Sequence, residues 1–262
     1  SVGDLCAVEP YLTCGNCPPC LRGQTNCCES LQCLGVHTDG GMREFVNLPV
    51  KTLRLANGVD PDQIALVEML GVGKHAAERG DIDESQLVAV IGMGPIGLSS
   101  ALFAKLTKAR IIGVDMSALR CQKAEELLGV ETLQIDPAKD LFEQFMDSHG
   151  RLPDVVIDAS GNKNSMQNAF ELPAHGGTLV FVGLIQGSIE FNVPSSHRRE
   201  LTTKSSRNCV AKDLDEIIEL MRAGIIDVRP WISHTCKLEE FPDKIEHWLN
   251  PNSGLVKAVI RC

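Results

Sequence analysis

The chain has 262 residues and a net charge of −9, and its acidic residues are scattered rather than gathered in blocks. This charge, without a basic stripe, excludes a nucleic-acid-binding surface of the usual kind. No apolar run reaches the roughly 18 residues that a membrane-spanning helix needs, so no membrane partner is expected either. The length suits one large α/β unit or two domains.

Residues 1–66 predict short strands and loops, including strands at the end of 35–46 and over 50–55. Eleven cysteines are present in the chain, and seven of them lie within the first 33 residues. A disulfide scaffold would spread its pairs through a small secreted chain. A dense cluster in one loop of an enzyme-sized chain instead favours a metal site and a reducing, cytoplasmic compartment.

The spacing C-x2-C-x2-C-x7-C suits a closed tetrahedral Zn²⁺ site on a tight loop. Four thiolates leave no position for a substrate, so this zinc would be structural. Two alternatives stay open: Cys27 could replace Cys28, or the cysteines could be free or disulfide-bonded. The preferred ligands are Cys14, Cys17, Cys20 and Cys28.

The segment 61–77 predicts a helix on which Glu68 lies among apolar side chains. A carboxylate in such surroundings is costly unless it is paired or ligates a metal. From the residues alone, an acid bonded to a neighbouring group is the default interpretation.

The stretch 87–115 predicts a dinucleotide-binding unit. A buried strand over 87–91 leads into a G-x-G-x-x-G turn and a helix over 96–106, whose free N–H groups point at phosphates. A second strand over 110–114 ends in Asp115, whose carboxylate can accept hydrogen bonds from the adenosine ribose and would repel a 2′-phosphate. The pattern therefore favours NAD over NADP; the alternative is a turn with structural glycines and no ligand. The glycines of this fingerprint are Gly92, Gly94 and Gly97.

Strands and helices continue to alternate after the fingerprint, which predicts a doubly wound parallel sheet with right-handed crossovers. Ligands bind at the carboxyl ends of such strands, so Asp115, 160–161 and 182–184 should share one rim. The expected helices cover 118–128, 139–149 and 166–172, and the expected strands cover 131–135, 154–158 and 178–182.

The last part of the chain breaks this rhythm. The segment 188–193 predicts a short edge strand, a candidate for dimerisation. The elements after residue 210 should pack back onto the first 66 residues. They follow a last strand over 201–206 and are a helix over 213–222, a strand over 231–235, a helix over 239–249 and a strand over 256–260.

In this order, the four-cysteine lobe, the fingerprint and the returning C-terminal segment resemble the zinc-containing medium-chain dehydrogenases. This is the superfamily of alcohol, sorbitol and threonine dehydrogenases. Besides the cysteines, the most specific parts are 66–76, 92–97 and 254–260, and the stretch 198–208 looks closest to members that act on polyols, sugars and sugar acids.

The resemblance implies an α/β fold with a Rossmann doubly wound parallel sheet and a partial, β-rich GroES-like catalytic domain built from both ends of the chain. The expected boundaries are 1–66 for the first part of the catalytic domain, 67–209 for the Rossmann domain and 210–262 for the return to the catalytic domain. Family habit and the edge at 188–193 point to a homodimer or homotetramer.

The resemblance also implies site residues. Glu68 matches a position that ligates the catalytic zinc in the polyol-type branch, so metal ligation, directly or through water, gains weight over a structural role. Arg207 would contact the cofactor or a substrate carboxylate or hydroxyl, or form a surface salt bridge. The remaining cofactor contacts would be Asp115 and Arg120 for adenosine, Pro95 and Ile96 for the pyrophosphate, and Val182, Gly183 and Leu184 for the nicotinamide carboxamide.

The implied activity is zinc-dependent hydride transfer between NAD(H) and a secondary alcohol. One departure is that no cysteine precedes Cys6 and no histidine stands in a Gly-His-Glu context, although the family's first catalytic-zinc ligands lie upstream of the lobe. We therefore expect an N-terminal portion of the parent to be missing and this chain alone to be inactive. The alternatives are a zinc-independent quinone or enoyl reductase and a non-catalytic NAD-binding relative.

Overall fold

The computed structural model describes residues 1–250 and 252–262. These residues form two compact units, each considered by itself. The first comprises Ser1–Gly71 and Asn208–Cys262, and the second comprises Val72–Arg207. The first division thus falls within helix α3 (Val67–Arg79).

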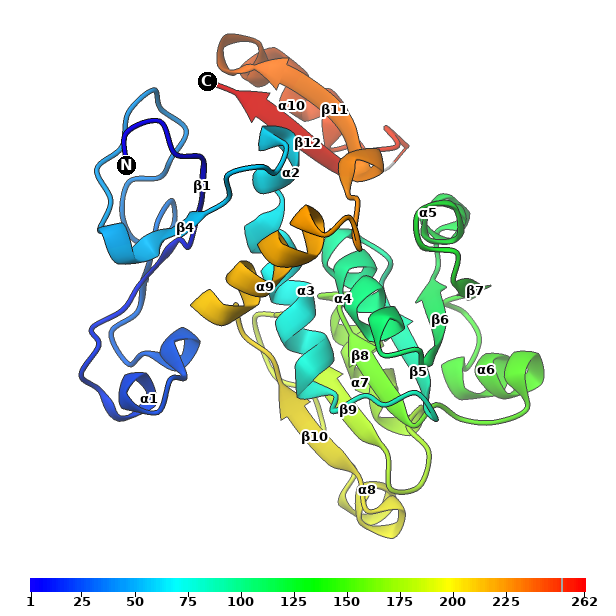
Figure 1. Cartoon of the computed structure of the whole chain (residues 1–262). Coiled ribbons are helices and arrows are strands. Elements are labelled where there is room, and N and C mark those ends of the chain that lie inside the picture. Colours follow the sequence, from blue (N-terminus) through cyan, green and yellow to red (C-terminus); the bar gives the residue numbers. More distant parts are fainter. Residues whose placement is uncertain (251) are drawn as a thin grey trace. The chain divides into compact units, whose positions relative to one another are not determined.

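The second unit is built on a six-stranded parallel sheet with the strand order β10-β9-β8-β5-β6-β7 (Figure 1). This is the order of a dinucleotide-binding Rossmann sheet, with its topological switch between β5 and β8. The doubly wound fold predicted from the sequence is confirmed. The strands are β5 (Leu87–Ile91), β6 (Arg110–Asp115), β7 (Glu131–Gln134), β8 (Val155–Asp158), β9 (Thr178–Phe181) and β10 (Thr202–Ser205).

The helices of this unit begin and end at local signals. Ser117 and Asp140 cap the amino ends of α5 and α6 through side-chain oxygens, and Gly129 and Gly150 end the same helices in the left-handed conformation. The helices are α4 (Pro95–Leu106), α5 (Ala118–Leu128), α6 (Leu141–His149), α7 (Lys163–Asn168) with a 3₁₀ turn over Ala169–Glu171, and α8 (Val193–Arg199).

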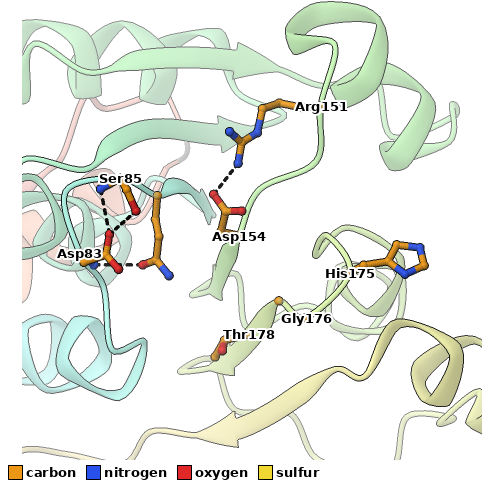
Figure 2. A pocket seen from close by; sticks show the side chains of 9 residues that line it. Asp83, Ser85, Arg151, Asp154, His175, Gly176 and Thr178 are labelled. Carbon is orange, nitrogen blue, oxygen red and sulfur yellow. Dashed lines mark hydrogen bonds and ion pairs between the residues drawn. The ribbon is translucent and has the colours of Figure 1, made fainter.

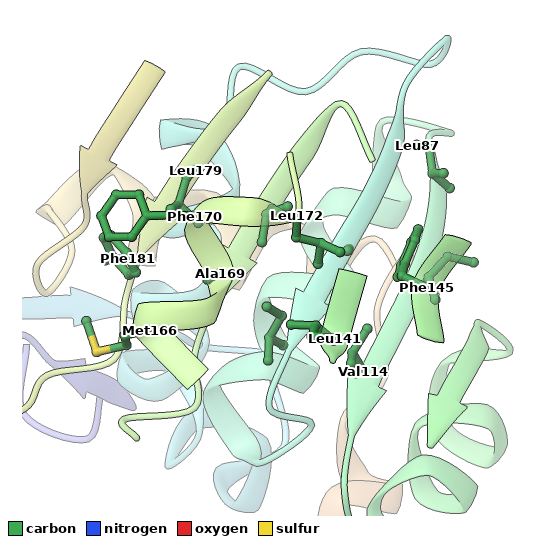
Figure 3. Packing of buried hydrophobic residues seen from close by; sticks show 14 residues of the cluster. Leu87, Val114, Leu141, Phe145, Met166, Ala169, Phe170, Leu172, Leu179 and Phe181 are labelled. Carbon is green, nitrogen blue, oxygen red and sulfur yellow. The ribbon is translucent and has the colours of Figure 1, made fainter. Parts of the chain in front are cut away.

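The core of the second unit lies against the sheet (Figure 3). All five residues of β5 are buried, as expected for a strand covered on both faces. Phe145 of α6 is fully buried in this core. At the other side of the cluster, the rings of Phe170 and Phe181 meet edge to face at 5.4 Å between centroids.

The edge strand predicted over 188–193 is wrong. Residues 188–192 have no regular structure, and α8 begins at Val193. The Asn192 side chain accepts a hydrogen bond from the backbone N–H of Ser195, and Pro194 lies in the first helical turn. These are strong helix-start signals, and they override an alternating pattern only six residues long. The structural basis expected for dimerisation is therefore lost.

The first unit contains three two-stranded sheets in the described chain: β1 with β4, β2 with β3, both antiparallel, and β11 with β12, parallel. The strand expected at the end of 35–46 is not formed; in the described chain that segment pairs with no strand. The elements are β1 (Cys6–Val8), β2 (Tyr11–Leu12), α1 (Pro18–Leu21), β3 (Gln32–Cys33), β4 (Leu53–Leu55), α2 (Pro61–Ile64), α9 (Ala211–Arg222), β11 (Ile232–Lys237), α10 (Phe241–Trp248) and β12 (Lys257–Arg261), with 3₁₀ turns over Thr25–Cys27, Val50–Thr52, Arg229–Trp231 and Leu238–Glu240.

Both ends of the chain contribute to the first unit, as predicted. The Arg222 guanidinium of α9 donates to the carbonyl oxygens of Leu55 and Asn57, at 2.9 and 3.0 Å. The backbone N–H of Val228 donates to the side-chain oxygen of Gln63 at 3.1 Å. In the described ranges, no helix is long and apolar enough to cross a membrane.

Replacement of Phe145 by Ala should lower the free energy of unfolding by about 3–5 kcal/mol, because it opens a cavity in the core. Phe142 on the same helix is 39% exposed and provides the matched control, for which Phe142→Ala should cost under about 1 kcal/mol. Denaturant unfolding of both variants measures this. Equal losses would contradict the assigned core.

Candidate functional site

The turn after β5 brings three backbone segments into close approach. Gly92 has a φ of +88°, and a Cβ placed on it would lie 2.8 Å from Cα of Ser160. A Cβ on Gly97 would lie 1.7 Å from the carbonyl oxygen of Gly92, so only glycine lets α4 pack this closely. A Cβ on Gly94 would meet nothing within 4 Å. Open space therefore lies beside the amino end of α4, where a pyrophosphate would bind.

Asp115 ends β6 with its carboxylate buried beside this turn. Its Oδ2 accepts a hydrogen bond from the backbone N–H of Met93 at 2.7 Å, and its Oδ1 accepts one from Ser117 at 2.8 Å. Nη1 of Arg120 lies 3.7 Å from Oδ2 on an exposed side chain. The carboxylate thus joins the fingerprint turn to the start of α5. Each oxygen retains acceptor capacity for a ribose hydroxyl.

The strand ends next to the turn are in register, which aligns one rim of the sheet. Ile91 pairs with Asp158, and Asp158 pairs with Phe181. The backbone N–H groups of Val182 and Gly183 both donate to the carbonyl oxygen of Asp158, at 2.9 and 3.0 Å. The segment that was expected to hold the carboxamide therefore lies on the same rim as the fingerprint turn, with the end of β8 between them.

The other predicted contact residues lie around this rim. Pro95 and Ile96 form the partly exposed first turn of α4. Leu184 is 83% exposed, which leaves its side chain and the adjoining backbone accessible to a ligand. Arg207 follows β10 and is exposed. The roles assigned to these side chains stay predictions.

The four predicted zinc ligands come together in the first unit. Their Sγ atoms all lie within 4.8 Å of one another; Cys14 is 3.5 Å from Cys28 and 4.0 Å from Cys20. Tetrahedral Zn²⁺ with Zn–S bonds of about 2.3 Å places sulfurs about 3.8 Å apart, so the donor set fits zinc. Cys27 is exposed and lies outside the group, which favours Cys28. None of the eleven cysteines, all of which the structure describes, forms a disulfide.

Backbone N–H groups favour the thiolate form of two of the four lobe cysteines, whereas burial raises the pKa of Cys20. Hydrogen bonds from Asn16 and Cys17 lower the pKa of the Cys14 thiol to about 6. The Cys14 backbone N–H likewise donates to the sulfur of Cys28 at 3.3 Å, and this contact lowers the pKa of Cys28. Both effects favour the thiolate, which is the form that binds zinc.

Glu68 has a partner that the sequence did not reveal. The Tyr11 hydroxyl donates a hydrogen bond to Oε1 of Glu68. Tyr11 is 4% exposed and Cys209 is fully buried, and burial raises the pKa of both groups, with nearby Glu68 raising each further. Tyr11 is the single tyrosine of the chain and stands in no motif, so only the fold could identify this contact.

A separate pocket of 310 Å³ lies at the opposite, amino ends of β5, β8 and β9 (Figure 2). Its polar groups are largely paired with one another. Asp83 accepts hydrogen bonds from the backbone and hydroxyl of Ser85, and Arg151 pairs with Asp154 at 2.5 Å. We assign no chemistry to this pocket.

Two family models match parts of the chain. Residues 1–57 match the alcohol dehydrogenase GroES-like domain, and residues 95–223 match the zinc-binding dehydrogenase family. L-galactonate-5-dehydrogenase of Escherichia coli K12 is 37% identical over 260 residues, which covers 98% of this chain and 76% of that protein.

Two solved structures are also similar. An alcohol dehydrogenase of E. coli CFT073 in complex with NADH has a TM-score of 0.93 and 26% identity, covering 100% of this chain and 77% of that one. A zinc-binding dehydrogenase of Sinorhizobium meliloti 1021 bound to NADP has a TM-score of 0.90 and 30% identity, covering 100% of this chain and 78% of that one.

The chain belongs to the zinc-containing medium-chain dehydrogenases, in the branch that includes polyol and sugar-acid dehydrogenases. The family inferred from the sequence is confirmed, and with it an oxidoreductase with zinc and NAD as cofactors and a small-molecule alcohol as substrate. The match of residues 95–223 to the zinc-binding dehydrogenase family favours this class over the zinc-independent reductase considered from the sequence.

Replacement of Cys14 by Ser should remove bound zinc from the lobe and lower thermal stability, because three thiolates do not close the site. Cys27→Ser is the matched control, since Cys27 is exposed and outside the group. Metal analysis of the purified variants should find that Cys14→Ser has lost about one zinc per chain and that Cys27→Ser has lost none. Zinc lost from the Cys27 variant instead would assign the ligand to Cys27.

Proposed function

We propose that this protein oxidises a secondary hydroxyl group of a sugar acid with NAD as hydride acceptor. The observation that carries the proposal is the fingerprint turn, with open space at Gly94 and the buried Asp115 carboxylate beside it. The 37% identity to an L-galactonate-5-dehydrogenase supports a sugar acid over a simple alcohol.

Bound NAD supplies the hydride acceptor, and bound zinc supplies a Lewis acid at the alcohol oxygen. The chain's own residues then bind and orient. Asp115 and Arg120 hold the adenosine ribose, and the first turn of α4 at Pro95 and Ile96 lies along the pyrophosphate. Residues 182–184 hold the nicotinamide carboxamide through backbone groups.

The metal-binding roles divide between two places in the first unit. The four cysteines of the lobe hold a structural zinc. Glu68 ligates the catalytic zinc, directly or through water, and the Tyr11 hydroxyl bonded to its Oε1 leaves Oε2 for that task. Arg207 contacts the cofactor or the substrate carboxylate, for which a guanidinium is well suited.

The domain boundaries, the oligomeric state and the cellular location are also proposed. The domain boundaries remain 1–66, 67–209 and 210–262, near the divisions between the two compact units. A homodimer or homotetramer is proposed from family habit alone, and sedimentation analysis tests it. A cytoplasmic location is proposed because a reducing compartment keeps the lobe thiols available for zinc.

Assay of the zinc-loaded full-length parent, the form for which activity is expected, with L-galactonate should show formation of NADH, faster than with sorbitol and faster with NAD than with NADP. The NAD preference follows from Asp115, whose charge repels a 2′-phosphate. Absorbance of the reduced nicotinamide measures each rate. Oxidation of sorbitol alone would contradict a sugar-acid substrate, and no oxidation of any sugar acid, sugar or polyol would contradict the proposed function.

A further inference from the structure

A buried carboxylate lies at the switch point of the sheet, and the function proposed above does not use it. Asp158 is the last residue of β8 and is 0% exposed. It pairs in register with Ile91, the last residue of β5, so it lies on the neighbouring strand beside the start of the fingerprint turn. Burial raises the pKa of Asp158 despite its hydrogen bonds. A carboxylate in such a place costs stability unless its partners compensate.

Three hydrogen bonds connect this carboxylate to the loop that follows β8. Oδ1 accepts one from the backbone N–H of Ser160 at 2.9 Å and one from the Ser160 hydroxyl at 2.7 Å. Oδ2 accepts one from the hydroxyl of Ser165, in the first turn of α7, at 2.8 Å. The side chain therefore ties both ends of the loop to the strand.

The loop held in this way fits tightly between two parts of the rim. On one side, a Cβ on Gly92 would lie 2.8 Å from Cα of Ser160. On the other side, a Cβ on Gly183 would lie 2.5 Å from the backbone nitrogen of Gly161. Neither glycine therefore has room for a side chain, and the loop packs closely against both segments. The position of Ser160 and Gly161 thus sets the spacing between the fingerprint turn and residues 182–184.

We propose that Asp158 is a positioning residue for the nicotinamide half of the bound cofactor. Its carboxylate holds the loop against Gly183 and so fixes where the backbone groups of 182–184 meet the carboxamide. The adenosine half depends instead on Asp115, at the end of β6, on the other side of β5. This role rests on the proposed NAD-linked function and deepens it.

Replacement of Asp158 by Asn keeps the shape of the side chain but removes its negative charge, and the amide nitrogen that replaces one oxygen cannot accept a hydrogen bond from Ser160 or Ser165. The dissociation constant of NADH, measured by fluorescence titration, should rise about tenfold, the scale of one lost charge-assisted hydrogen bond. The dissociation constant of ADP-ribose, which lacks the nicotinamide ring, should stay within about twofold, as expected when no contact is lost. Ser165→Ala removes one of the three bonds and should act in the same direction, less strongly.

Asp154→Asn is the matched control. Asp154 lies just before β8, at the opposite end of the strand, where its carboxylate also accepts a backbone hydrogen bond, from Leu87 at 2.8 Å. Both dissociation constants should be unchanged in this variant. If Asp158→Asn fails to fold, as judged by thermal unfolding, the dissociation constants of NADH and ADP-ribose for Ser165→Ala test the positioning role instead.

Equal weakening of NADH and ADP-ribose binding, or unchanged NADH binding in both the Asp158 and Ser165 variants, would overturn the positioning role alone. No NADH binding by the unsubstituted protein would overturn the proposed function, and this role with it.

Discussion

The close approach of backbone around Gly92 is the constraint on which the cofactor site depends. Helix α4 can begin where it does only because Gly97 has no side chain facing the Gly92 carbonyl. The loop at Ser160 also comes close from the neighbouring strand, because a Cβ on Gly92 would lie 2.8 Å from Cα of Ser160. Because these contacts are between backbone atoms, they bring the helix end, the turn and the adjoining strand ends to one place. The open space at Gly94 is what remains for a ligand.

Two buried carboxylates support this arrangement from opposite sides. Asp115 accepts backbone hydrogen bonds from the turn itself, at Met93, and from the start of the next helix. Asp158 binds the loop after β8. Charged groups are costly inside a protein, and here each is satisfied by donors whose positions determine the shape of the rim. The same side chains therefore serve stability and recognition.

The sequence predicted the parts of the molecule that local patterns encode. The run 87–91, the glycine spacing and Asp115 defined the Rossmann unit, because strand, turn and helix there follow one another within a few residues. The cysteine spacing defined the zinc lobe for the same reason. The edge strand predicted over 188–193 was wrong. Alternation of polar and apolar residues over six positions is a weaker signal than the helix start formed by Asn192 and Pro194.

Contacts between residues far apart in the chain were beyond such patterns. Nothing adjacent to Tyr11 marks it as the partner of Glu68, 57 positions away. The three hydrogen bonds to Asp158 join residues that are close in the chain. Their importance follows from the burial of the Asp158 side chain beside the fingerprint turn, and that burial depends on the order of the strands in the sheet. Long-range pairing is decided by packing, which one sequence does not display.

The central claim is that a dinucleotide binds in the open space at Gly94. Its most direct test is the dissociation constant of NADH for Gly94→Ala, measured alongside thermal unfolding. Gly94 has a φ of −73°, and an added Cβ meets no protein atom within 4 Å, so folding should be unaffected. The methyl group would occupy the space of the pyrophosphate, and NADH should bind about tenfold more weakly or worse. Unchanged NADH affinity in a stably folded variant would contradict the account.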